Sequence, residues 1–155
     1  MKIGIIVYSH TGNTFSVAEK LEERLVAAGH SVKIEKVVAL NNKQRSASKI
    51  QLKSIPDISA YDALVFGSPV RGFSLSTVMT AYLLQVASLK GKSVFCYVTQ
   101  FFPSPSMGGN RAIEQMKEMC ESKGAKVSES GIVNWSNLRR GKMIRDIIEK
   151  VSGLY

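Results

Sequence analysis

The sequence has few of the residues that support disulfide-rich, metal-bound or membrane-spanning folds. Its two cysteines, Cys96 and Cys120, form no C-x-x-C pair and have no histidine at metal-ligand spacing, which excludes a disulfide framework and a zinc knuckle. No apolar run approaches the roughly 18 residues that span a bilayer, and residues 3–7 are shorter than a signal-peptide core. The 12 glycines and four prolines follow no repeat, which excludes collagen-like chains. We therefore expect a globular, cytoplasmic protein without a membrane segment.

Acidic residues are the other scarce class. The chain has 12 Asp and Glu against 21 Lys and Arg, a formal net charge of +9. Such an excess predicts an anionic partner, such as nucleic acid, anionic lipid or an acidic protein. The basic residues gather between positions 33 and 53 and between positions 139 and 145. Neither cluster is interleaved with aromatic residues or accompanied by a nucleic-acid motif, so a basic nucleic-acid-binding module ranks below the function developed next.

The length of 155 residues suits one domain, and the start of the chain predicts its type. Residues 2–8 form a nearly continuous, β-branched apolar run, which is typical of a strand buried on both faces of a parallel sheet. Residues 13–28 place apolar side chains at steps of three to four and are followed by Gly29. That spacing predicts an amphipathic helix with a glycine stop.

The same strand and helix signals alternate along the rest of the chain. We expect further strands at 31–38, 63–67, 93–99 and 126–133, and further helices at 75–89, 111–122 and 138–151. Residues 41–56 are polar and basic, and we expect a loop with a short helix there. Five strands alternating with helices predict a three-layer, doubly wound α/β domain with a parallel sheet. Ligands bind such sheets at the carboxyl ends of the strands where the strand order reverses, so the loops after the first, third and fourth strands are candidate sites.

The loop after the first strand is rich in hydroxyl groups. Together with the free N–H groups of a helix start, these side chains form a cradle suited to a phosphate monoester. Neither G-x-x-x-x-G-K-[ST] nor G-x-G-x-x-G occurs in this loop, and the alternative is that its residues merely cap the helix. The candidate residues are Ser9, His10, Thr11, Gly12, Asn13 and Thr14.

This loop carries a resemblance to a known family. The pattern Ser9-x-Thr11-Gly12-x-Thr14, placed after Ile6-Val7-Tyr8, closely resembles the phosphate-binding loop [ST]-x-T-G-x-T of flavodoxin-like FMN proteins. The resemblance covers essentially the whole chain. It implies a single flavodoxin-like domain over residues 1–155, a five-stranded sheet in the order 2-1-3-4-5, and a non-covalently bound FMN.

By the same resemblance, the two other loops lie beside the flavin ring. The loop after the third strand supplies Ser68, Pro69, Val70, Arg71, Gly72 and Phe73. Its backbone would reach the N5 and O4 edge of the ring, and Arg71 would either favour the anionic reduced flavin or point into solvent.

The loop after the fourth strand departs from typical flavodoxins because it has neither an acidic residue nor a tyrosine. Its Gly-Gly followed by a polar residue is more similar to flavodoxin-like quinone reductases. Two phenylalanines in it either stack on the flavin or pack against neighbouring loops. The candidate residues are Thr99, Gln100, Phe101, Phe102, Gly108 and Gly109.

The resemblance implies an FMN-binding redox protein that transfers electrons through its flavin. The alternative is an FMN-dependent NAD(P)H or quinone oxidoreductase, which can assemble a substrate pocket across a homodimer interface. The electron acceptor would be a redox partner protein, acidic because this chain is basic, or a small molecule. The charge also predicts that the second reduction step of the flavin has a higher potential than in acidic relatives. His10 has no triad partner, and neither cysteine starts a C-x-5-R loop, which argues against a hydrolase or phosphatase.

Overall fold

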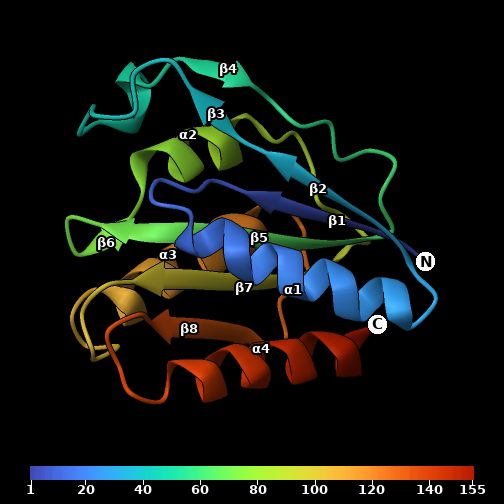
Figure 1. Ribbon diagram of the computed structural model, residues 1–155. Helices are drawn as coiled ribbons and strands as arrows, with labels where there is room; N and C mark the ends of the chain where they lie inside the picture. The colour runs from blue at the N-terminus through green and yellow to red at the C-terminus, as the bar shows by residue number, and fades with distance from the viewer.

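The strands form a parallel sheet whose order reverses between β1 and β5 (Figure 1). The computed structural model describes all residues from 1 to 155. The parallel strands, in their order across the sheet, are β2 (Ser31–Lys36), β1 (Lys2–Val7), β5 (Ala63–Arg71), β7 (Ser93–Gln100) and β8 (Ser130–Asn134). Numbered among themselves along the chain, these strands have the order 2-1-3-4-5, so the predicted fold class and strand order are confirmed.

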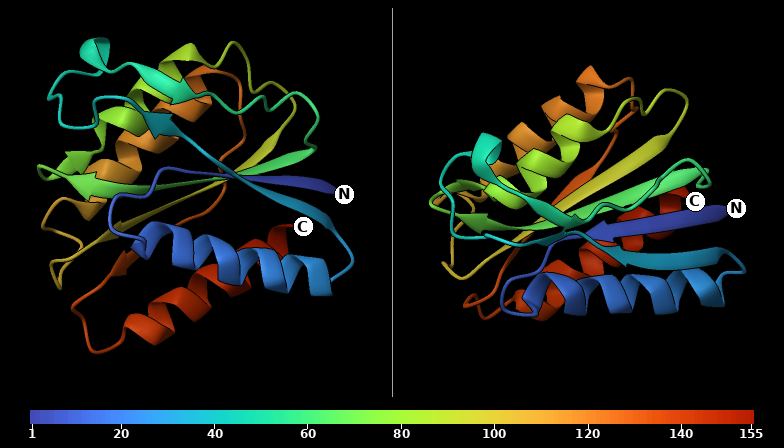
Figure 2. Two further views of the ribbon diagram at one scale, coloured as in Figure 1. Left: turned by 45° about the horizontal axis from the view of Figure 1, so that its top comes forward. Right: turned by 90° about the horizontal axis from the view of Figure 1, so that it is seen from above.

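The helices cover both faces of the sheet (Figure 2). One face carries α1 (Asn13–Ala27) and α4 (Arg140–Leu154), and the other carries α2 (Thr77–Gln85) and α3 (Gly109–Ser122). From β1 the chain moves to β2 on one side, whereas from β5 it moves to β7 and β8 on the other. Because such crossovers are right-handed, the two directions place their helices on opposite faces. No helix is both long and apolar enough to cross a membrane.

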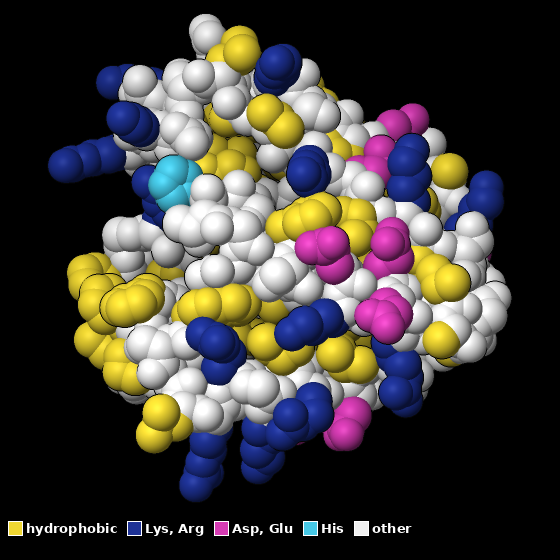
Figure 3. All heavy atoms as spheres, in the orientation of Figure 1, with side chains coloured by type: hydrophobic (Ala, Val, Ile, Leu, Met, Phe, Trp, Pro, Cys, Tyr) yellow, Lys and Arg dark blue, Asp and Glu magenta, His cyan; other side chains and the backbone are white.

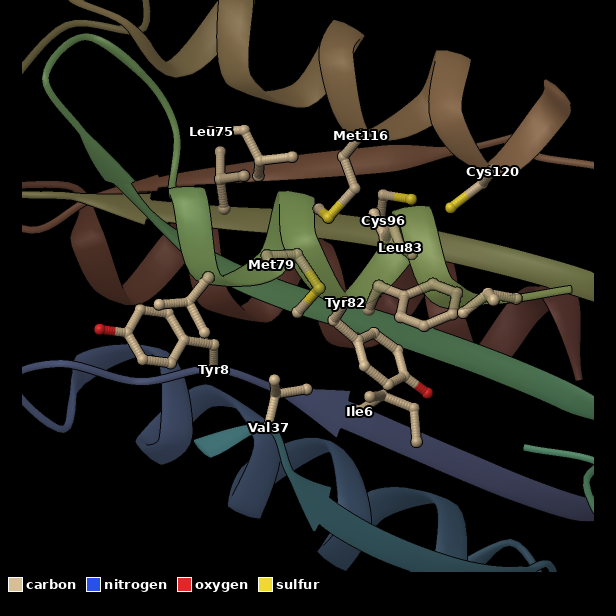
Figure 4. Close-up of a cluster of buried hydrophobic side chains, with 14 of the residues drawn as sticks. Ile6, Tyr8, Val37, Leu75, Met79, Tyr82, Leu83, Cys96, Met116 and Cys120 are labelled. Carbon is tan, nitrogen blue, oxygen red and sulfur yellow. The ribbon is translucent and has the colours of Figure 1, made fainter. Parts of the chain in front are cut away.

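Alternate side chains of β1 enter two separate hydrophobic cores. Ile3, Ile5 and Val7 pack with α1 and α4, and Ile6 packs with α2 and α3 (Figure 4). This second cluster also holds Cys96 and Cys120, both free and fully buried. The hydrogen bond with the Cys120 thiol, together with burial, holds the pKa of the Cys96 thiol well above its ordinary value. Cys96 is thus a fully buried residue of the strand that the sequence predicts at 93–99.

The basic segment after β2 is more ordered than a loop. It pairs β3 (Val38–Ala39) with β4 (Leu52–Ser54) in an antiparallel ribbon, and the short 3₁₀ helix η1 (Ala47–Lys49) lies between them. Asn41 fastens the segment, since its amide donates to the Lys49 carbonyl and its side-chain oxygen accepts from the Gln51 N–H, each at 2.7 Å. The short helix is confirmed, but the ribbon was missed because strands of two or three residues show no periodicity.

The chain after β5 also differs from the sequence prediction. β5 continues to Arg71 and turns back through Gly72 and Phe73 into β6 (Ser74–Leu75). Both turn residues have positive φ angles, 59° and 60°, which is the type I′ geometry of tight hairpins. The helix expected from residue 75 therefore begins at Thr77, where the Ser76 side chain caps it by accepting from the Met79 N–H at 3.2 Å.

Two boundaries near the end of the chain shift as well. The fifth parallel strand begins at Ser130, although the prediction began it at residue 126; Lys126 makes an isolated bridge to Ser93. The last helix runs from Arg140 to Leu154, two residues later at its start and three at its end than predicted.

Candidate functional site

The loop between β1 and α1 presents a set of backbone donors at the carboxyl edge of the sheet. Gly12 precedes the helix with φ 95°, and no side chain caps the helix. Ser9 Oγ accepts instead from the N–H groups of Gly12 (3.2 Å) and Phe15 (3.3 Å), which folds the loop back on itself. The N–H groups that have no acceptor in the protein are those of Ser9, His10, Thr11, Asn13 and Thr14.

These donors fit the phosphate of FMN. Several N–H groups at the positive end of a 15-residue helix favour an anion, and the exposed Thr11 and partly exposed Asn13 and Ser9 add polar side chains around them. Gly12 has open space within 4 Å of the position a Cβ would take, so the backbone can approach a ligand closely. Capping alone does not use all of these donors: Ser9 Oγ accepts from the Phe15 N–H, but the N–H groups of Asn13 and Thr14, the first two of the helix, have no acceptor in the protein.

Thr14 has a different place from the other residues of this loop. It is 1% exposed, and its hydroxyl lies 2.7 Å from that of Thr99, which is 3% exposed. The carbonyl of Thr14 accepts from the buried Tyr97 hydroxyl at 2.8 Å. Side chains of β7 thus make hydrogen bonds with the first turn of α1.

The turn between β5 and β6 exposes backbone donors at the same edge. The N–H groups of Gly72 and Phe73 have no acceptor in the protein, and the Phe73 side chain is 56% exposed. Gly108 packs directly beneath this turn, since a Cβ at that position would lie 2.7 Å from Phe73 Cα. The turn and the loop after β7 therefore form one packed unit.

The loop after β7 is held by amide side chains. Gln100, which is 5% exposed, donates to the carbonyls of Ser104 (3.0 Å) and Met107 (3.4 Å). Asn134 donates to the Phe102 carbonyl at 2.9 Å, and its own side-chain oxygen is buried without a partner. With the loop held in this way, Phe101 and Phe102 lie at the protein surface. Phe101 is 70% exposed and Phe102 is 42% exposed.

The three predicted loops meet at the carboxyl ends of β1, β5 and β7, as expected. Their residues fall into two groups by burial. Those buried as supports of the site are Thr14, Ser68, Thr99, Gln100, Gly108 and Gly109. Those exposed or half-buried at its surface are Ser9, His10, Thr11, Gly12, Asn13, Pro69, Val70, Arg71, Gly72, Phe73, Phe101 and Phe102.

Sequence reasoning missed a lysine near the phosphate loop. Lys36 Nζ lies 4.2 Å from the centre of the Phe15 ring, an attractive cation–π distance, and Lys36 lines a cavity of about 310 Å³ together with Ser9 and Gly12. The signal was available, because Lys36 ends β2, and β2 is the neighbour of β1 in the predicted strand order.

A larger cavity, of about 510 Å³, also has Tyr8 in its lining. Its lining includes Lys43 and Arg45 from the segment between β3 and η1, and Arg71 from the end of β5. Arg71 therefore lines a cavity together with two other basic residues, an environment that the sequence does not reveal. Figure 3 shows Lys and Arg side chains gathered over this segment and again near the start of α4.

A doubly wound sheet with a hydroxyl-rich anion loop at its switch point defines the class of flavodoxin-like proteins. The family described as NADPH-dependent FMN reductase matches residues 1–139. The chain belongs to this family, and so to a flavodoxin-like group of FMN-binding redox proteins.

Individual relatives agree with this assignment. A flavodoxin of Megasphaera elsdenii is 26% identical over 135 residues, which cover 85% of each chain. An NAD(P)H dehydrogenase (quinone) of Cupriavidus metallidurans is 30% identical over 95 residues, 57% of this chain and 48% of that relative, so the chain matches about half the length of that protein. The flavodoxin structure of Streptococcus pneumonia TIGR4 superposes with a TM-score of 0.71 and 16% identity, covering all of both chains, and shows the same fold.

Proposed function

We propose that residues 9–14 hold the FMN phosphate and that residues 68–73 and 99–102 hold the flavin ring. The observation that carries this proposal is the group of backbone N–H donors without a protein acceptor at the start of α1. A phosphate dianion there gains several charge-assisted hydrogen bonds and the favourable end of the helix dipole. Gly108 and Gly109 are buried supports that keep the loops together.

Bound FMN supplies the electron transfer, and the protein supplies binding, orientation and electrostatics. The free N–H groups of Gly72 and Phe73 would donate to acceptors at the ring edge. The rings of Phe73 and Phe102, which lie nearly parallel at 5.8 Å between centroids, offer apolar faces at the mouth of the site. Arg71, Lys36 and the helix start make this edge of the sheet electropositive, which favours a negatively charged cofactor.

A second candidate function is an FMN-dependent NAD(P)H or quinone oxidoreductase. Its support is the 510 Å³ cavity beside the proposed ring site, within the size range of small-molecule sites, together with membership of a family of NADPH-dependent reductases. We further propose that residues 1–155 act as one domain in the cytoplasm. The basic surface would receive an acidic partner protein, and a homodimer would be one way to complete a substrate pocket.

Two measurements test these proposals. The purified protein should be yellow with the absorbance bands of bound flavin, and the flavin released by denaturation should be FMN. A colourless protein that does not take up added FMN would contradict the first proposal. Steady-state oxidation of NAD(P)H with a quinone acceptor then separates the candidates: turnover above about one per second, within the ordinary range of enzymes, supports the oxidoreductase, and its absence supports a carrier.

A further inference from the structure

The loops at the carboxyl edge of the sheet contain basic but no acidic residues. No Asp or Glu occurs in residues 1–18, 36–56, 63–113 or 130–145, and every loop that follows a parallel strand lies within one of these ranges. These loops share one side of the molecule in Figure 1, where Figure 3 shows Lys and Arg side chains above and below a group of hydrophobic ones. The electrostatic potential at this edge therefore has one sign and attracts anions.

Basic residues are densest at the start of α4. Arg139, Arg140, Lys142 and Arg145 are exposed, and none of them forms an ion pair. Arg139, Arg140 and Lys142 lie in or beside the first turn of the helix, where cations oppose the helix dipole. They therefore do not stabilise α4, and an anionic binding partner gives these charges a physical role.

Leu138 stands out among these cations. Its relative exposure is 104%, so its side chain packs against nothing in the protein. The turn that carries it is hydrogen-bonded on both sides, because the Asn137 side-chain amide donates to the Pro103 carbonyl at 3.0 Å and the Asn137 side-chain oxygen accepts from the Arg139 N–H at 2.8 Å. These bonds fix the turn, and the leucine projects from it into solvent.

Trp135 lies beside the same cations. It is half-buried, and the Arg140 guanidinium lies 4.8 Å from the centre of its ring. Arg140 Nη1 also donates to the Trp135 carbonyl at 2.9 Å. Both side chains combine an apolar body with a polar group, and tryptophan in particular is enriched where lipid headgroups meet acyl chains.

We propose that the start of α4 binds the surface of an anionic lipid bilayer and that Leu138 enters the acyl chains. Basic residues near a bilayer are attracted to anionic headgroups, and an apolar side chain among them anchors a protein that lies on a membrane without spanning it. Such binding needs no membrane-spanning helix. The lipid-binding surface consists of Trp135, Leu138, Arg139, Arg140, Lys142 and Arg145.

The exposed leucine favours lipid over an acidic protein as the partner of this surface. An acidic protein offers the same charge complementarity, but it would need a pocket placed to receive the side chain of Leu138. Acyl chains receive an apolar side chain at any position of the bilayer. The surface shares no residue with the segments proposed for FMN, so the two kinds of binding can be measured separately.

The test is cosedimentation of FMN-loaded protein with vesicles of equal parts phosphatidylserine and phosphatidylcholine, and with vesicles of phosphatidylcholine alone. We expect tighter binding to the anionic vesicles, weakened by added salt. The variant R139Q/R140Q/K142Q should bind them about 100-fold more weakly, since each basic residue near a bilayer contributes roughly a factor of five. Its melting temperature should be unchanged or higher, because the removed charges oppose the helix dipole.

Two control variants match these changes. K2Q/K90Q/K126Q removes the same charge from exposed lysines at the opposite edge of the sheet and should bind the vesicles as the unmodified protein does. L138Q should weaken binding several-fold, because the apolar side chain no longer gains from leaving water. L84Q changes another exposed leucine, 58% exposed in α2, and should have no effect.

Trp135 gives a second readout, because it is the only tryptophan of the chain. Lipid brominated in its acyl chains quenches the fluorescence of a tryptophan that reaches the bilayer. Such lipid in the anionic vesicles should quench Trp135 of the unmodified protein, and it should quench L138Q less.

Three results would overturn the proposal. The first is equal binding, or none, to the two kinds of vesicle. The second is that R139Q/R140Q/K142Q binds as tightly as K2Q/K90Q/K126Q. The third is normal vesicle binding by L138Q; if poly-L-glutamate then displaces the protein, the surface receives an acidic protein instead. FMN content is measured by absorbance in every variant, so a failure of the proposed flavin binding is distinguishable from a failure of lipid binding.

Discussion

The hydroxyl oxygens of Thr14 and Thr99 lie 2.7 Å apart in the protein interior, although the residues are 85 positions apart in the chain. Thr14 is in the first turn of α1, and Thr99 is near the end of β7. Both are candidate cofactor-binding residues, and their hydroxyl groups face each other. The pair joins the loop proposed for the phosphate to the strand that ends at the proposed ring site.

We predict that T14V and T99V each lower the free energy of unfolding by about 1–3 kcal/mol, because each leaves the partner hydroxyl buried without a hydrogen bond. The double variant T14V/T99V should lose less than the sum of the two, since both polar groups are then gone. Urea unfolding of the four proteins measures this. Strict additivity would show that the hydrogen bond does not couple the two loops.

A substitution at Gly67 tests how closely β5 packs against Tyr97 of β7. A Cβ there would overlap the Tyr97 ring, whose hydroxyl holds the Thr14 carbonyl. We expect G67A to destabilise the protein by about 1–3 kcal/mol through overpacking and to weaken FMN binding, because Tyr97 must move. The control is G153A in α4, where the Cβ meets nothing within 4 Å and alanine should stabilise the helix by up to about 1 kcal/mol. An unchanged melting temperature for G67A would contradict this account.

Phe73 holds a backbone conformation that phenylalanine rarely adopts, with φ 60°. Replacing it with asparagine relieves about 1 kcal/mol of strain but removes the stacking on Phe102, which contributes about as much. F73N should therefore be more stable than F102N, which loses the same stacking without relief. Both variants should bind flavin less tightly. Thermal unfolding compares them, and equal losses of stability would show that the turn is not strained.

The sequence predicts best those elements that depend on residues next to one another in the chain. The run at 2–8 predicts a buried strand because every side chain in it is apolar, and the hydroxyl pattern at 9–14 predicts the anion loop because the donors lie next to one another. By contrast, the ribbon of β3 and β4 and the cavity that Arg45 and Arg71 both line depend on how a distant segment folds back over α2. Helical or strand periodicity carries no information about such contacts.

Burial is the other property that the sequence conceals. Thr99 and Gln100 are polar residues at the end of a strand, and polarity at that position indicates a ligand contact. The structure uses Gln100 to support the following loop, which the sequence could not distinguish because the acceptors are backbone carbonyls.

The buried hydroxyl of Tyr155 should make the stability of the protein depend on pH in alkaline solution. Its hydroxyl donates to the carbonyls of Leu64 (3.3 Å) and Ser93 (3.2 Å), and burial raises its pKa from 10 to about 12. The folded protein therefore keeps a proton that the unfolded chain loses, so stability is fully present below pH 10 and declines as the pH rises towards 12. Y155F should decline less steeply over this range. Unfolding in urea at several pH values checks the difference, and parallel curves would rule out a contribution from Tyr155.

We propose above that the start of α1 binds the phosphate of FMN. The most direct test is a fluorescence titration of flavin-free protein with FMN and with riboflavin, which lacks the phosphate. We predict that FMN binds at least about 100-fold more tightly, as expected for several charged hydrogen bonds. S9A should lower the affinity for FMN and leave the affinity for riboflavin unchanged, because Ser9 Oγ accepts hydrogen bonds that shape the donor loop. Equal affinities for FMN and riboflavin would show that the start of α1 does not bind the phosphate.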